Sequence, residues 1–185
     1  MKNLLLAIAA VALFATTSSF AQKINFGIGA DLALPITSGF SDAVGIGIGG
    51  TAKVYYPLKD EMVVLTGTAG YMTFSGKSQT IGGQSINAGS WSMMPLLVGA
   101  RYYFAPLSAK FRPYGGFDMG MIFSSFKIPS QTIGGVTFGG GSASGSDFTY
   151  QPQLGFVASQ FDVAVRFLGV SGASCIAARF GYIFN

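Results

Sequence analysis

The chain contains no histidine and a single cysteine among its 185 residues. Without histidine, the Ser-His-Asp and Cys-His mechanisms of nucleophilic catalysis are excluded. The lone thiol of Cys175 can form no internal disulfide, and together with scattered carboxylates it supplies no metal-ligand cluster. We therefore expect a protein that is not an enzyme and that binds no metal and no cofactor.

Charge is also scarce. Charged residues make up 10% of the chain, whereas soluble domains carry about a quarter, and the mean hydropathy is +0.49. After the N-terminal region no stretch approaches the roughly 18 apolar residues of a spanning helix. An apolar chain with 27 glycines and no spanning helix favours a membrane β-barrel. The net charge of +4 is scattered singly, so we expect no nucleic-acid partner.

The N-terminus has the three parts of an export signal. Lys2 is followed by an apolar run from Leu4 to Phe14 and by the small-x-small site Ser19-Phe20-Ala21. We predict a cleaved signal peptide over residues 1–21 and a single barrel domain over residues 22–185. A retained membrane anchor is the alternative, but the run is well short of the roughly 20 residues that a spanning helix needs.

Strict alternation of apolar and polar residues dominates the rest of the chain. In the first segment Ile24, Phe26 and Ile28 alternate with Asn25 and Gly27. Such segments exceed the typical 5 to 6 residues of soluble strands, and we predict eight strands of ten or more residues, of which the last three are the shorter ones. We predict an all-β fold, an eight-stranded antiparallel up-and-down transmembrane β-barrel. The predicted strands are 24–34, 43–56, 62–74, 91–104, 113–126, 150–156, 161–167 and 176–184.

Aromatic residues gather near both ends of these segments, as they do at the two water boundaries of a bilayer. A soluble lipocalin-like barrel is the alternative, but it needs a charged exterior that this chain lacks. One predicted belt contains Phe26, Tyr56, Tyr102, Phe104, Phe161, Tyr182 and Phe184, and the other contains Tyr71, Phe74, Trp91, Phe123, Phe126 and Tyr150.

Connections between the segments are asymmetric. Those around 57–61, 105–112 and 159–160 are short, and those at 35–42 and 171–172 are tight, whereas 75–90 and 127–147 are long and rich in Gly and Ser. Both long connections contain Ser-Gln-Thr-Ile-Gly-Gly, at 78–83 and at 130–135. A Gly-Gly pair between β-formers predicts a two-residue hairpin, so we expect strands three to six to protrude beyond the membrane and to close in tight turns. The repeat is either functional or a coincidence of turn chemistry.

Seven ionisable residues fall on the inward side of the predicted strands. Two interpretations are open, a structural core of ion pairs and a gate or ligand site. We predict Asp31 opposite Arg179, bridging it to Arg166, with Gln153 completing the row and Arg101 near Asp118. The predicted lumen cluster is Asp31, Lys53, Arg101, Asp118, Asp162, Arg166 and Arg179.

Glycines at 45, 47 and 49 share one face of a predicted strand. We expect them to relieve crowding in a narrow lumen rather than to cradle a phosphate.

The run Met94–Phe104, followed by Phe111–Gly116, resembles the outer-membrane-protein β-barrel domain family, the small OmpX/OmpA-like eight-stranded barrels. The ending Phe180, Tyr182 and Phe184 resembles the C-terminal signal read by the barrel-insertion machinery, although Asn185 follows it. The resemblance implies a place in the bacterial outer membrane, with outer-membrane lipids and that machinery as partners and both termini in the periplasm.

The function that we expect is a structural or surface-interaction role, adhesion-like, carried by protruding strands and by the connections 75–90 and 127–147. Its partner would be an extracellular or envelope protein, and the barrel itself a monomer. The alternative is a narrow pore for small or apolar solutes.

Overall fold

The computed structural model describes residues 24–59, 62–77, 79–81, 84–86, 89–133, 136–138 and 140–184. The predicted signal peptide, Gln22 and Asn185 lie outside these residues, as do Ser78 and both Gly-Gly pairs of the repeat. Within the described part of the chain, no helix is long and apolar enough to cross a membrane.

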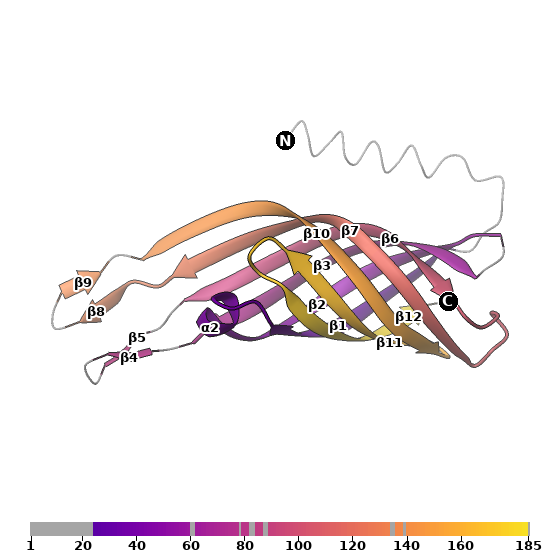
Figure 1. Cartoon of the computed structure of the whole chain (residues 1–185), viewed down its shortest axis with the longest axis horizontal. Helices are drawn as coiled ribbons and strands as arrows, with labels where there is room; N and C mark the ends of the chain where they lie inside the picture. Colours follow the sequence, from indigo (N-terminus) through magenta and orange to yellow (C-terminus); the bar gives the residue numbers. More distant parts are fainter. Residues whose placement is uncertain are drawn as a thin grey trace, which may run out of the picture.

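Eight long antiparallel strands close into one barrel, so the predicted fold class is confirmed (Figure 1). Neighbouring strands follow the chain in an up-and-down order, and β1 closes the barrel against β12. At the seam Phe26 faces Phe184 and Asp31 faces Arg179, in the predicted register. The strands are β1 (Asn25–Pro35), β2 (Val44–Pro57), β3 (Val63–Gly76), β6 (Ser90–Tyr103), β7 (Phe111–Ile128), β10 (Gly141–Ala158), β11 (Phe161–Val170) and β12 (Cys175–Phe184).

Two small hairpins extend one end of the barrel, opposite the end that holds the C-terminus (Figure 1). They are β4 (Gln79–Ile81) with β5 (Gln84–Ile86), and β8 (Gln131–Ile133) with β9 (Val136–Phe138). Ile81 pairs with Gln84 and Ile133 pairs with Val136, so each connection spans two residues, as predicted.

Two local expectations were wrong. The connection after β1 is not a plain tight turn, because it contains the one-turn helix α2 (Phe40–Ala43), which is too short to show a helical period. The sixth long strand, β10, is not short but 18 residues long, like β7. Its first half reads Gly-Ser-Ala-Ser-Gly-Ser and is exposed on both faces, so it has no alternation to detect.

The barrel is apolar outside and polar inside, the reverse of a water-soluble barrel. Leu96, Val98 and Leu154 are 59%, 67% and 69% exposed on the outer face, whereas Arg101 and Asp118 are 1% and 0% exposed inside. An apolar exterior of this extent is stable against the hydrocarbon of a membrane. The charged side chains face the lumen, where they find polar partners.

The lumen is filled in layers. At the hairpin end Phe40 of α2 turns inward onto Phe74 and Trp91, with ring centroids 5.4 and 5.0 Å apart. Phe74, Trp91 and Phe126 form one register row on the inward side, so placing these three in the lipid-facing belt was wrong. The opposite end holds a second cluster with Tyr55, Tyr103 and Tyr114. The charged layer lies between the two clusters.

Candidate functional site: the charged lumen and the projecting sheet edge

All seven ionisable residues of the predicted lumen cluster point inward. They come from six of the strands, because each sits on the inward phase of its own alternation. The exposed fractions are 2% for Asp31, 1% for Lys53, 1% for Arg101, 0% for Asp118, 0% for Asp162, 2% for Arg166 and 2% for Arg179.

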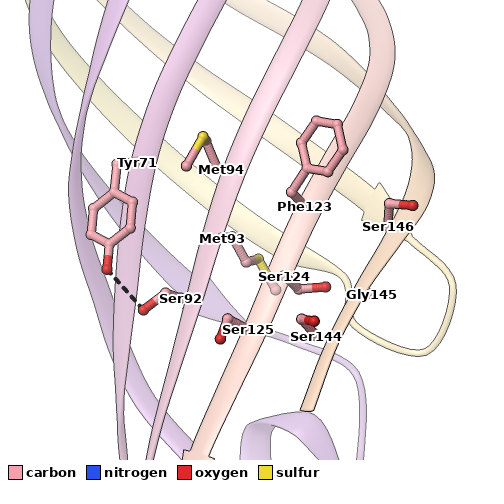
Figure 2. Close-up of a pocket in the computed structure, with 10 residues that line it drawn as sticks. All are labelled: Tyr71, Ser92, Met93, Met94, Phe123, Ser124, Ser125, Ser144, Gly145 and Ser146. Atoms are coloured by element: carbon pink, nitrogen blue, oxygen red, sulfur yellow. Dashed lines mark hydrogen bonds between the residues drawn. The ribbon is translucent and has the colours of Figure 1, made fainter. Parts of the chain in front are cut away.

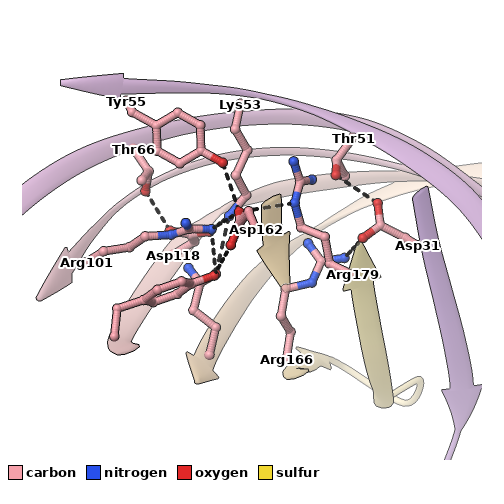
Figure 3. A network of polar contacts seen from close by, with 12 residues as sticks. Asp31, Thr51, Lys53, Tyr55, Thr66, Arg101, Asp118, Asp162, Arg166 and Arg179 are labelled. Carbon is pink, nitrogen blue, oxygen red and sulfur yellow. Dashed lines mark hydrogen bonds and ion pairs between the residues drawn. The ribbon is translucent and has the colours of Figure 1, made fainter. Parts of the chain in front are cut away.

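Asp162 on β11 is the centre of this layer (Figure 3). Its carboxylate accepts hydrogen bonds from Arg101 Nη2 at 3.0 Å, Tyr55 OH at 3.0 Å and Tyr114 OH at 2.6 Å. Arg179 Nε lies 3.5 Å from the same carboxylate. The Arg101 guanidinium also lies over the Tyr114 ring, 4.1 Å from its centroid. One buried anion therefore joins two cations and two phenols.

A second carboxylate, that of Asp118 on β7, binds side chains of β2 and β3. It accepts from Lys53 Nζ at 3.0 Å and from Thr66 Oγ1 at 2.8 Å. The amide oxygen of Gln153 accepts from both Lys53 and Arg101 at 3.3 Å, so it connects this group to the Asp162 group.

Asp31 pairs with Arg166 and accepts from Thr51 Oγ1 at 2.8 Å. The predicted bridge from Asp31 to Arg179 was wrong, although the two residues are backbone neighbours. Arg179 turns away towards Asp162, into space left by two glycines. A Cβ at Gly29 would lie 2.8 Å from the Arg179 Cζ, and one at Gly181 would lie 3.0 Å from its Nη2.

The predicted Arg101–Asp118 contact was also wrong. Gly99, not Arg101, faces Asp118 across the β6–β7 ladder, and Arg101 reaches across the lumen to Asp162 instead. Likewise Arg166 faces Ala177 rather than Arg179. Long side chains in a narrow barrel select partners across the lumen, not only along the ladder.

Several polar residues of the layer were absent from the predicted cluster, namely Thr51, Tyr55, Thr66 and Tyr114. Their position in the two-residue alternation of each strand could have identified them. Tyr55 and Thr51 flank Lys53 at two-residue spacing on β2, so they share its face.

The predicted insertion signal lies on the outer face of β12. Phe180 and Phe184 are 59% and 48% exposed, and Tyr182 contacts Phe184 with centroids 5.1 Å apart. These rings lie at the end that carries the C-terminus. Recognition by insertion machinery stays a prediction.

The second feature is a sheet edge that projects beyond the barrel wall. β7 and β10 pair along their whole length, from Ile128–Gly141 to Phe111–Ala158. β11 joins the other edge of β10 only from Thr149, which pairs with Val170. Gly141–Phe148 is therefore paired with β7 on one side and has no strand on its other side among the described residues, and it is exposed throughout. Part of the predicted connection 127–147 is therefore the first part of β10, which begins at Gly141.

Comparisons with known proteins identify the fold. The sequence matches no family model and no curated protein. Among solved structures, Neisserial surface protein A is similar at 13% identity with a TM-score of 0.55, over 86% of this chain and 95% of that one. Ail, the attachment invasion locus protein of Yersinia pestis, is similar at 14% identity with a TM-score of 0.52, over 89% of this chain and 100% of that one. A further Ail structure contains the heparin analogue sucrose octasulfate.

These likenesses and the closed antiparallel barrel define the class. The chain has the fold of the small eight-stranded outer-membrane β-barrels.

The lumen network generates a stability prediction. Replacing Asp162 by Ala leaves Arg101 and Arg179 buried beside no carboxylate, so Asp162→Ala should lower the free energy of unfolding by about 3–5 kcal/mol. Asp31→Ala should cost a similar amount through Arg166. Urea unfolding of the refolded barrel in lipid vesicles measures both changes. The control is Asp147→Ala on the projecting edge, which should stay within about 0.5 kcal/mol. Equal, small effects of all three variants would contradict a structural network.

The same network predicts a closed lumen. The purified wild-type barrel should show negligible single-channel conductance in planar bilayers, because crossed side chains fill the charged layer. Phe40→Ala removes one ring from the apolar cluster at the hairpin end and leaves the charged layer intact, so this variant should remain closed. Steady, well-resolved openings of the wild type would favour the pore alternative instead.

Proposed function

We propose that this protein is an outer-membrane surface-interaction protein that binds an extended segment of a partner protein along the free edge of β10. The observation that carries the proposal is the segment Gly141–Phe148, which pairs with β7 on one side and is unpaired on the other. An exposed strand presents alternate N–H and C=O groups, which an added strand can satisfy with main-chain hydrogen bonds.

The chemistry of this edge suits strand addition. Its small side chains let another backbone approach closely, and Asp147 contributes a charge that discourages indiscriminate pairing. Because main-chain hydrogen bonds carry little sequence information, specificity would come from the faces of this segment and from the two hairpins.

The proposed placement follows from the same geometry. Lipids of the outer membrane surround the apolar band of a monomeric barrel, the short turns and both termini lie in the periplasm, and the hairpin end lies outside the cell. This orientation matches insertion from the periplasm after export by the predicted signal peptide. We propose no catalytic role.

The orientation is tested with inserted epitopes. A tag placed between residues 134 and 135 should be bound by antibody on intact cells, because that hairpin projects outward. The matched control is a tag between Ser159 and Gln160, at the opposite end, which should be detected only after the outer membrane is permeabilised. Heat-modifiable migration on gels shows that each tagged barrel is folded. Surface detection of the second tag alone would reverse the orientation.

The edge is tested with a pair of lysine variants. Ser144 and Ser125 are direct partners on the same face, but Ser144 is on the free edge and Ser125 is on β7, which is paired on both sides. Peptides selected from a displayed library on the nanodisc-embedded barrel should bind wild type and Ser125→Lys alike, and Ser144→Lys at least about tenfold more weakly.

Bound peptide should also slow hydrogen exchange of the Gly141–Phe148 amides. Peptides that bind both variants equally, without protecting these amides, would show that the partner site is not the edge.

A further inference from the structure

A hollow of about 410 Å³ lies on the outer wall of the barrel near the hairpin end, where β3, β6, β7 and β10 run side by side (Figure 2). Its lining is uncharged and combines hydroxyls with rings and thioethers. The residues that carry the argument are Tyr71, Ser92, Met94, Phe123, Ser125 and Ser144.

Strand register arranges the hydroxyls in a line. Thr73 faces Ser92, Ser92 faces Ser125, and Ser125 faces Ser144, so one hydroxyl per strand crosses all four strands on the outer face. Neighbouring strands are about 4.8 Å apart, so the row presents evenly spaced donors and acceptors. Tyr71 OH donates to Ser92 Oγ at 2.9 Å and so orients one hydroxyl of the row.

On β6, β7 and β10 this row marks the limit of the apolar exterior towards the hairpin end. The next row towards the termini is mixed, with Met94, Phe123 and Ser146, and the row beyond it is fully apolar, with Leu96, Met121 and Phe148. The hollow therefore straddles the level at which the wall changes from lipid-facing to hydroxyl-lined.

The ladder between β3 and β6 has a gap beside the hollow. Pro95 lies in β6 and has no N–H to give to the β3 ladder. The ladder is interrupted there, since pairs are formed at Ala69–Leu96 and at Met72–Met93 but not between them.

We propose that this hollow binds the neutral sugar headgroup of a glycolipid in the membrane that the barrel spans. Hydroxyls both donate and accept, as sugar hydroxyls do, and the Tyr71 and Phe123 rings offer apolar faces to the C–H side of a sugar ring. The apolar row below leaves the acyl chains in contact with Leu96 and Met121.

The lining also argues against a charged headgroup. Phosphate or carboxylate recognition uses Arg or Lys, and the hollow has neither. Lys127 lies one row further out, between Ser90 and Ser142. The proposal relies on the membrane placement of the proposed function but not on the free edge of β10, so either can fail without the other.

The test uses the whole barrel in phosphatidylcholine nanodiscs with increasing mole fractions of monogalactosyl diacylglycerol. Amide NMR signals of Ser92, Ser125 and Gly145 should shift saturably. Diacylglycerol without the sugar, and phosphatidylglycerol, should leave them unchanged. Equal shifts with either of these lipids, or no shift with the galactolipid, would overturn the proposal. Binding of free galactose as tight as that of the galactolipid would also overturn it, because the source would then be a soluble sugar.

Variants locate the site. Ser92→Ala and Ser125→Ala should each weaken galactolipid binding about two- to tenfold, the range for one lost hydrogen bond. Tyr71→Phe keeps the ring and removes the hydroxyl, so it should fall in the same range. The matched control is Ser142→Ala, on the same strand as Ser144 but outside the hollow, with affinity unchanged. Unchanged affinity in all three test variants, with folding verified by heat-modifiable migration, would show that the hydroxyl row is not the site.

Discussion

The carboxylate of Asp162 is the contact on which the rest of the barrel interior depends. Through Tyr55, Arg101, Tyr114 and Arg179 it connects β11 to four other strands, β2, β6, β7 and β12. Five of the eight strands of the barrel thus meet at one carboxylate. Charges cannot face hydrocarbon cheaply, so they must pair within a lumen that is only wide enough for side chains. Buried ion pairs add little net stability over apolar packing, but breaking one is costly. The apolar outer faces of the strands do not distinguish one strand register from another. The specific ion pairs of the network do, because they form only in one register.

Glycines make this interior possible. Gly29 and Gly181 leave room for the Arg179 guanidinium, and Gly47 leaves room for the Phe74 ring. Each lies on the inward phase of its strand, where a larger residue would collide with a long side chain crossing from elsewhere. The inward glycines thus provide the space that the few bulky and charged inward side chains occupy.

Much of the fold could be predicted from the period of two, because every strand of a membrane barrel must show one face to lipid. The count of strands and the closure of β1 on β12 followed from that pattern, and the two-residue hairpins followed from the Gly-Gly pairs. Cross-lumen partners such as Arg101 with Asp162 could not be predicted, since register fixes backbone neighbours while the guanidinium reaches across. The start of β10 at Gly141 could not be placed from the sequence, although protruding strands were expected. Gly141–Ser146 has only small side chains on both faces, so it shows no apolar alternation.

The inward turn of α2 also gives the chain an optical property. Trp91 is the only tryptophan in the sequence, and it lies in the mouth of the barrel with Phe40 at 5.0 Å and Phe126 at 5.9 Å. All indole fluorescence of the unlabelled protein therefore originates from one point, beneath the helix that covers the hairpin end. The emission spectrum reports the environment of that mouth alone.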